Sequence, residues 1–336
     1  AGDVIFSSIA AYDATSDNSD IGSAIASDRT LSKYNTTGTT KVIIASGEAL
    51  TIDATKTLTI ASGVILEITS GRTLTIASTG TLTSTAGIVD NDGTIACSGT
   101  ITTSSNFTGS SGLVSFASVA AYDDSVASGQ LSTSLGDDTT IANYMGAGVG
   151  TTKVILSGSE TLTTSTHTLT INTDVTLEVA SGTTLTIAGA ITKSGAIDGA
   201  GDVIFSSIAA YDATSDNTDI TTITAATRTL DKYNSLTTTI TIDNSETLTI
   251  DAATEFTIAS GVTLVIDSGG ELSNAGIIVK NSGGTFTTTS GTLTNTGLVL
   301  DKETNALTFN SDGGTSQTIN NNFTIASTQT LTIASG

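Results

Sequence analysis

Large apolar side chains return every eight residues over long stretches of this 336-residue chain. Within each octad, apolar residues alternate with threonine, and a small corner such as Ala-Ser-Gly follows, as in the segment LTIASGVI. Alternation with period two predicts a short strand with one buried face, and the glycine and serine then turn the chain. The longest series with this spacing are Val42, Leu50, Leu58, Leu66, Leu74 and Leu82, and Ile240, Leu248, Phe256, Leu264 and Leu272.

Strands this short cannot bury an apolar face alone, so consecutive strands must stack as a coil whose ladders run along its axis. Three octads would make a turn of about 24 residues, and two would make a flatter coil of about 16. We favour three sides, and the sequence leaves both open. The chain has no proline, as expected where every main-chain N–H is needed in a ladder. The predicted fold is all-β, a three-sided parallel β-helix (β-solenoid).

The octads resemble those of a known class, the secreted β-solenoid repeat proteins of microbial surfaces, which include filamentous adhesins and autotransporter passengers. The segments that carry the resemblance are TLTIASGVILEI at 57–68, TLTIASTGTL at 73–82 and FTIASGVTLVI at 256–266. The resemblance covers most of the chain. It implies a β-solenoid fold and an extracellular or cell-surface location, and it does not specify an activity, because many activities occur on this scaffold.

Three large repeats are superimposed on the octads. The segment AGDVIFSSIAAYDATSDNSDI opens at Ala1 and returns almost unchanged at Ala200, and a looser copy, SGLVSFASVAAYDD, begins at Ser111. We therefore predict three solenoid repeats, at 1–110, 111–199 and 200–336.

Each repeat starts with a stretch that breaks the octad rule, which we call the tyrosine unit: residues 7–35, 117–145 and 206–234. All six tyrosines lie in these units as pairs 22 residues apart, namely Tyr12 and Tyr34, Tyr122 and Tyr144, and Tyr211 and Tyr233. An aliphatic residue three positions before each tyrosine predicts two short helical turns per unit. Two interpretations stay open: the units cover their own solenoid, or they make lateral contacts with another subunit.

Composition excludes several classes of function. One histidine, His167, and one cysteine, Cys97, are too few for a structural zinc site or an internal disulfide. The net charge of −21 leaves no basic surface for nucleic acid, and no apolar run is long enough for membrane insertion. We also expect no enzyme, because the arginines Arg29 and Arg228 occupy equivalent places in two repeats, whereas an active site is normally built once.

Acidic clusters follow the first tyrosine in two of the units. The segments DATSDNSD and DATSDNTD supply three carboxylates each, a composition that suits calcium. The alternative is a solvated turn whose carboxylates cap backbone amides. No other cofactor is expected. The candidate ligands are Asp13, Asp17, Asp20, Asp212, Asp216 and Asp219.

The repeated Thr-Leu-Thr triplets, such as 57–59 and 81–83, also resemble the threonine arrays of solenoid ice-binding proteins. Charged residues such as Glu67 and Arg72 interrupt the series, and threonine is in any case a favourable outward residue in strands. Ice binding is therefore the less favoured function.

Neither end of the sequence reads as a capping segment, and joining the final LTIASG to the initial AGDVIF would write SGAGDVIF, close to an internal junction, DGAGDVIF. Two explanations stay open: the 336 residues are a piece of a longer chain, or copies stack end to end. We expect a subunit of an extracellular filament that polymerises head to tail by completing β-ladders between solenoid ends. The alternative is the stalk of an adhesin or a viral tail fibre. The expected partners are other copies of the chain, with a host surface or a polysaccharide as further candidates. The predicted junction residues are Ala1, Val4, Phe6, Leu331 and Ile333.

Overall fold

The structure, a computed structural model, groups the chain into two compact units, the first of residues 1–160, 170–180 and 193–197 and the second of residues 161–169, 181–192 and 198–336. The division into three sequence repeats stays a prediction.

The described residues are 2–15, 21–102, 106–126, 131, 135–158, 161–164, 166–214, 220, 226–301, 306–309 and 330–332. For 306–309 and 330–332 only the backbone is described.

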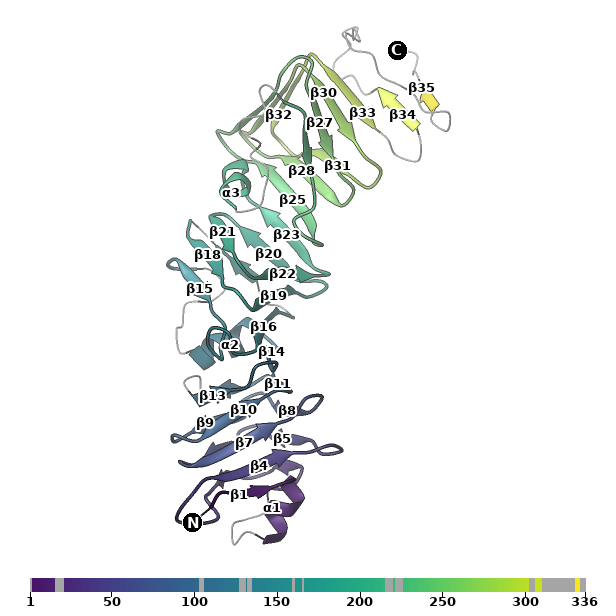
Figure 1. Cartoon of the computed structure of the whole chain (residues 1–336). Coiled ribbons are helices and arrows are strands. Elements are labelled where there is room, and N and C mark those ends of the chain that lie inside the picture. Colours follow the sequence, from purple (N-terminus) through teal and green to yellow (C-terminus); the bar gives the residue numbers. More distant parts are fainter. Residues whose placement is uncertain are drawn as a thin grey trace. The chain divides into compact units, whose positions relative to one another are not determined.

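The first unit is built from three parallel sheets (Figure 1). The first sheet contains β1 (Val4–Phe6), β4 (Thr40–Ile44), β7 (Val64–Ile68), β10 (Ile88–Asn91) and β13 (Phe107–Thr108). The second contains β2 (Ala24–Ile25), β5 (Leu50–Ile52), β8 (Thr73–Ile76), β11 (Thr94–Cys97), β14 (Leu113–Phe116), β16 (Thr151–Leu156) and β19 (Val175–Val179). The third contains β3 (Arg29–Leu31), β6 (Thr57–Ile60), β9 (Thr81–Ser84) and β12 (Thr100–Ile101).

The second unit repeats this organisation, and its strand pairs run parallel except for the antiparallel pair β33–β34. One sheet contains β17 (Thr161–Thr163), β20 (Thr184–Ile187), β23 (Asp202–Phe205), β25 (Thr237–Ile242), β28 (Val262–Ile266) and β31 (Thr285–Thr288). Another contains β24 (Arg228–Leu230), β27 (Glu255–Ile258), β30 (Ile277–Lys280), β33 (Leu298–Asp301), β34 (Ala306–Phe309) and β35 (Thr330–Thr332). The third contains β26 (Thr247–Ile250), β29 (Glu271–Asn274) and β32 (Thr292–Asn295).

Four further strands are β15 (Thr139–Ile141), β18 (Thr168–Ile171), β21 (Ala190–Lys193) and β22 (Ala196–Gly199). The first three form a sheet in the order β15, β18, β21, and β22 is the last strand of the eight-stranded sheet that begins with β2.

The strand register confirms the predicted three-sided coil. Val42 of β4 pairs with Leu66 of β7, 24 residues later, and β5 and β6 lie between them on the other two sides. Leu58 pairs with Leu82 at the same spacing. Each octad is therefore one side of a turn, and the ladder hydrogen bonds run along the axis of the coil.

The alternation read from the sequence also sets the burial. In β7 the side chains of Val64, Leu66 and Ile68 are buried, and the intervening Ile65 and Glu67 are only half-buried. Corners adopt left-handed backbone conformations, for example φ 75° at Gly63 and 63° at Thr55. Stacks of Leu, Ile and Val side chains thus form a core that continues from one turn to the next.

Turns that contain a tyrosine unit are longer. The registers Val4 to Thr40, Val114 to Thr152 and Val203 to Thr238 span 36, 38 and 35 residues. The excess holds three short helices in the described residues, at the positions expected for the first tyrosine of each pair: α1 (Ile9–Thr15), α2 (Val119–Val126) and α3 (Ile208–Asp212).

The second helical turn predicted for each unit is wrong. Leu31, Ile141 and Leu230, which precede the second tyrosines, each end a strand instead, in β3, β15 and β24. Leu31 is fully buried and pairs with Ile60 of the next turn. The ladder therefore determines the conformation here, and the spacing of three between Leu31 and Tyr34 is not helical.

Candidate functional site

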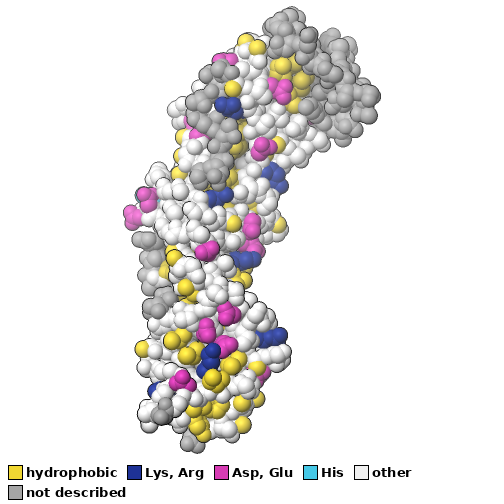
Figure 2. All heavy atoms as spheres, viewed as in Figure 1, with side chains coloured by type: hydrophobic (Ala, Val, Ile, Leu, Met, Phe, Trp, Pro, Cys, Tyr) yellow, Lys and Arg dark blue, Asp and Glu magenta, His cyan; other side chains and the backbone are white. Residues whose placement is uncertain are grey.

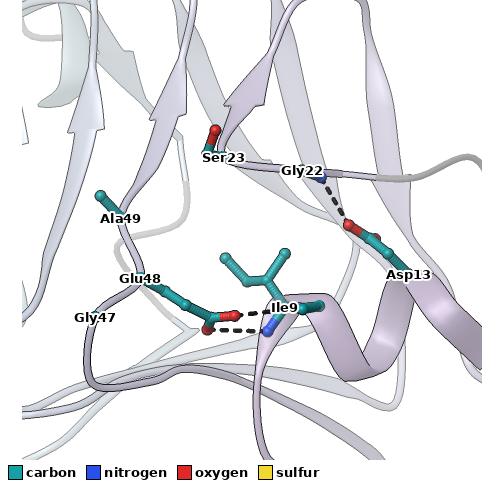
Figure 3. Close-up of a pocket in the computed structure, with 8 residues that line it drawn as sticks. Ile9, Asp13, Gly22, Ser23, Gly47, Glu48 and Ala49 are labelled. Carbon is teal, nitrogen blue, oxygen red and sulfur yellow. Dashed lines mark hydrogen bonds between the residues drawn. The ribbon is translucent and has the colours of Figure 1, made fainter.

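The tyrosine units are the irregular parts of the fold, and α1 shows how one is built. The Oγ of Ser8 accepts the N–H of Ala11 at 3.0 Å, as expected for an N-cap serine. The two carboxylate oxygens of Glu48 accept the N–H groups of Ile9 and Ala10 at 3.1 and 3.2 Å (Figure 3). Otherwise unpaired amides at the start of α1 are thus bound by one residue of the helix boundary and one residue of the next turn.

The same arrangement occurs in the third repeat, where Glu246 accepts the N–H groups of Ile208 and Ala209, each at 3.0 Å. Burial raises the pKa of Glu48, but hydrogen bonds from the N–H groups of Ala45, Ile9 and Ala10 outweigh this effect and leave the pKa below its ordinary value. The carboxylate therefore caps α1 in its ionised form.

An aspartate directly after the first tyrosine closes the loop that follows the helix. The two oxygens of Asp13 accept the N–H groups of Ile21 and Gly22, both at 2.8 Å. Asp212 accepts the N–H of Ile220 at 2.7 Å. These bonds are the backbone-capping role that was the alternative to calcium.

The other four predicted calcium ligands, Asp17, Asp20, Asp216 and Asp219, lie outside the described residues. Within the described ranges, no group of three or more His, Cys, Asp or Glu side chains is placed to hold a metal ion. Calcium binding stays a prediction.

A phenylalanine and two tyrosines pack together in every unit. The rings of Phe6, Tyr12 and Tyr34 meet edge to face, with centroids 5.2 Å apart for Phe6–Tyr12 and 5.4 Å for Phe6–Tyr34. Corresponding pairs in the other units lie 5.0 to 5.6 Å apart, a favourable aromatic geometry: Phe116 with Tyr122 and Tyr144, and Phe205 with Tyr211 and Tyr233.

The first tyrosine of the pair also binds the backbone 20 residues later. The hydroxyl of Tyr122 donates to the C=O of Ala142 at 3.1 Å and accepts the N–H of the same residue at 2.9 Å. Tyr12 makes the equivalent contacts with Ser32, at 3.4 Å each. The tyrosine thus joins the helix to the strand that completes the turn.

Five of the six predicted contact tyrosines are buried in their own chain, with exposed fractions of 4% or less, whereas 46% of Tyr34 is exposed. This burial favours the interpretation that the units cover their own solenoid. Lateral contact with another subunit stays a prediction. The buried tyrosines are Tyr12, Tyr122, Tyr144, Tyr211 and Tyr233.

A pocket of about 270 Å³ lies beside α1 (Figure 3). Its walls come from α1, from Gly22 and Ser23, and from the corner that carries Glu48. Asp13 also lines it, and the carboxylates of Asp13 and Glu48 are both engaged with backbone amides of this chain. The pocket is therefore lined by Ile9, by small residues and by two carboxylates that are already hydrogen-bonded.

The predicted junction residues are described only in part. Val4 and Phe6 lie in β1, the end strand of its sheet, and Phe6 is buried. Leu331 lies in β35, of which only the backbone is described, and Ala1 and Ile333 lie outside the described residues. Their role in a junction stays a prediction.

Sequence reasoning missed the capping glutamates. One signal was present: a glutamate stands two residues before a leucine at the start of the first octads of each repeat, at Glu48, Glu160 and Glu246. Glu160 lies outside the described residues. A charged residue that recurs once per large repeat, in a chain with few charges, marks a structural contact.

No family model matches the chain, and no curated protein matches it. A solved structure, the crystal structure of the TibC-catalyzed hyper-glycosylated TibA55-350 fragment, aligns with 87% of this chain and 97% of its own at 18% identity, with a TM-score of 0.18. Similarity at this level carries no argument about function. Among the described residues, no helix is long and apolar enough to span a membrane.

Proposed function

We propose that this chain is a structural subunit of an extracellular filament and that copies associate end to end through their β-ladders. The observation that carries the proposal is the set of strands that end their sheets. In the first unit β1 and β3 are end strands, and in the second unit β31 and β32 are end strands among the described residues. An end strand presents unpaired backbone groups to a further strand.

The outward side chains fit a fibre that does not aggregate sideways. The outer faces of the ladders carry threonine and charged residues, and Lys41 forms ion pairs with Glu67 and Asp90 of successive turns. The net charge of −21 makes copies repel one another laterally, most strongly at low salt. Axial contacts between backbone groups are much less affected by this charge.

Electron microscopy of the purified full chain, together with sedimentation at increasing concentration, tests the proposal. We expect unbranched filaments whose length increases with protein concentration. Isolated rods of one subunit at every concentration would contradict it and would favour the stalk of an adhesin or tail fibre. The extracellular location belongs to the proposal and rests on the sequence resemblance.

A further inference from the structure

The helices of the second and third tyrosine units each rest on the end of a ladder from the preceding repeat. In the first unit of the fold, β12 ends its sheet, and the N–H of its Ile101 is donated to the Oγ of Ser125 in α2 at 3.0 Å. The C=O of Ile101 accepts the hydroxyl of Tyr144 at 2.6 Å. A serine of the helix and the second tyrosine thus bind both backbone groups of one strand residue.

The third repeat builds the hydroxyl half of this contact with a different strand. There β21 is an end strand, and the N–H of its Ile191 is donated to the Oγ1 of Thr214, two residues after α3, at 3.3 Å. Both hydroxyls that receive the strand also donate within the helix, Ser125 to the C=O of Ala121 and Thr214 to that of Ala210, at 2.7 and 2.9 Å. The bond that each hydroxyl donates fixes its orientation, and a lone pair of the same oxygen then accepts the N–H of the strand residue.

The first repeat has the same receiving groups, and they are exposed. Thr15 is the equivalent residue, and its Oγ1 donates to the C=O of Ala11 at 2.8 Å, as in the other two units. Thr15 is solvent-exposed, whereas Ser125 and Thr214 are 8% and 2% exposed.

The second tyrosines differ in the same way. Tyr34 is 46% exposed, whereas Tyr144 and Tyr233 are 4% and 3% exposed. Ile5 of β1, in the same repeat as Tyr34, is 64% exposed. Hydrophobic side chains gather at the end of the first unit that carries β1 and α1 (Figure 2). The first tyrosine unit thus presents, in exposed positions, the two residues equivalent to Ser125 and Tyr144, which bind a strand residue in the second tyrosine unit.

The strands that fill the internal contacts share a sequence pattern. Both read Gly-x-Ile-Thr, at 99–102 and 189–192. Both glycines lie so close to the preceding turn that an added Cβ would be 2.2 and 2.1 Å from a backbone oxygen, of Gly80 and His167 respectively. A related sequence, Gly-Thr-Leu-Thr, occurs at 80–83 in β9, an inner strand of its sheet, and at 291–294 in β32, which ends its sheet among the described residues and in which Leu293 is half-buried. The chain therefore itself contains an end strand similar in sequence to those that occupy the internal contacts.

We propose that the first tyrosine unit is an end socket that receives an end strand of a second copy of this chain, whose backbone N–H binds the Oγ1 of Thr15 and whose C=O accepts the hydroxyl of Tyr34. This inference rests on the proposed function and specifies the groups that form the junction. It differs from the junction predicted from the sequence, because side chains of the helix and the second tyrosine, in addition to strand backbone, hold the incoming strand. A contact of one surface with a different surface of the next copy does not close on itself, so it extends into a filament.

The test uses a copy whose socket is blocked, the double variant Thr15→Arg, Tyr34→Arg of the full chain. Alone it should remain monomeric where the wild-type chain assembles. Mixed with wild-type chain it should act as a terminator, because it retains the strand end but cannot accept another copy. One blocked copy in ten should limit filaments to about ten subunits. The milder variant Thr15→Val, which lacks the accepting hydroxyl, should weaken association about tenfold.

The matched control is Ser70→Arg, at another exposed position on a corner after β7, which should assemble as the wild type does. Thermal unfolding of each variant, followed by circular dichroism, verifies that the blocked copy is folded. Filaments of normal length from the blocked copy would overturn the socket and leave the filament function standing. Absence of assembly by the wild-type chain at every concentration would overturn both.

Discussion

The plain octad turns and the turns with a tyrosine unit reach the same three-sided section by different means. A plain turn is closed by its ladders, as where Leu58 pairs with Leu82 24 residues on. A tyrosine turn of 35 to 38 residues is closed by side chains as well: a capping glutamate, a loop-closing aspartate and a tyrosine hydroxyl on a distant backbone. Regular turns thus depend on apolar burial repeated many times, whereas the irregular turns depend on a few specific polar contacts.

The largest effects in both kinds of turn should come from substitutions in their cores. Phe116→Ala removes a fully buried ring that packs on two tyrosines, Tyr122 and Tyr144. We expect a loss of about 3–5 kcal/mol in the free energy of unfolding, against about 2–5 kcal/mol for Leu66→Ala in a plain turn. Denaturant unfolding measures both. A cost for Phe116→Ala below that for Leu66→Ala would mean that the aromatic group adds nothing to ladder burial.

The tyrosine hydroxyl is the next strongest contact. Tyr122→Phe leaves both backbone groups of Ala142 without the hydroxyl that they bind, so we expect a loss of about 1–3 kcal/mol. Tyr34→Phe is the matched control, because this ring is half-exposed, and in the monomeric protein it should cost about 0.5 kcal/mol or less. Equal effects of the two variants on the denaturation midpoint would contradict a specific role for the contact between the Tyr122 hydroxyl and the backbone of Ala142.

The capping glutamate should have a smaller effect that depends on pH. Glu48→Gln weakens the cap of α1 and should cost about 1 kcal/mol, seen as faster amide exchange of Ile9 and Ala10. Because folding lowers the pKa of Glu48 from its ordinary value of 4.5, its contribution is complete above pH 4.5 and is lost as pH falls through the lower folded pKa. The Gln variant should lack this acid dependence.

A suitable control for this experiment is Glu178→Gln, which removes a partly exposed partner of Lys153 on a plain turn. Exposed ion pairs contribute about 0–1 kcal/mol, and amide exchange in α1 should be unchanged in this variant. An identical acid dependence of α1 exchange in the Glu48→Gln protein would show that other carboxylates hold the helix.

Cys97, in a plain turn, should show the smallest effect, one confined to alkaline pH. Burial raises the pKa of its thiol from 9.0 to about 12. The folded chain therefore retains the proton more tightly than the unfolded chain, and the stability that this gives is complete below pH 9 and is lost as pH rises toward 12. Cys97→Ala should flatten part of this decline in melting temperature. Fast modification by a thiol reagent in the folded protein at pH 8 would contradict the burial.

The sequence was sufficient for the regular part of the fold, because the octads carry both the strand period and the corner residues. Val64, Leu66 and Ile68 are buried as their alternation indicates. The tyrosine units were predicted less well, because a spacing of three between Leu31 and Tyr34 fits a helix locally while the ladder with Ile60 holds Leu31 in a strand. Local periodicity does not reveal a partner one turn away in the coil.

The side-chain contacts were beyond sequence reasoning for the same reason. Glu48 and Ile9 are 39 residues apart, and nothing in either local segment indicates that they meet. The receiving role of Ser125 likewise depends on where β12 ends. Only the alignment of the three repeats with one another indicates such positions, because it shows which polar residues recur once per repeat.

The distance in sequence between a helix and its cap also has a consequence for synthesis. A ribosome releases α1 before Glu48 and before the backbone of Ser32 that Tyr12 binds. The emerging segment therefore has no stable helix until the following turn has been made and has closed over it. In the later units the helix also rests on a strand synthesised earlier, as Ser125 does on Ile101. Nascent chains from which α1 has emerged but Glu48 has not should thus be the most sensitive to proteolysis, and folding should advance turn by turn from there.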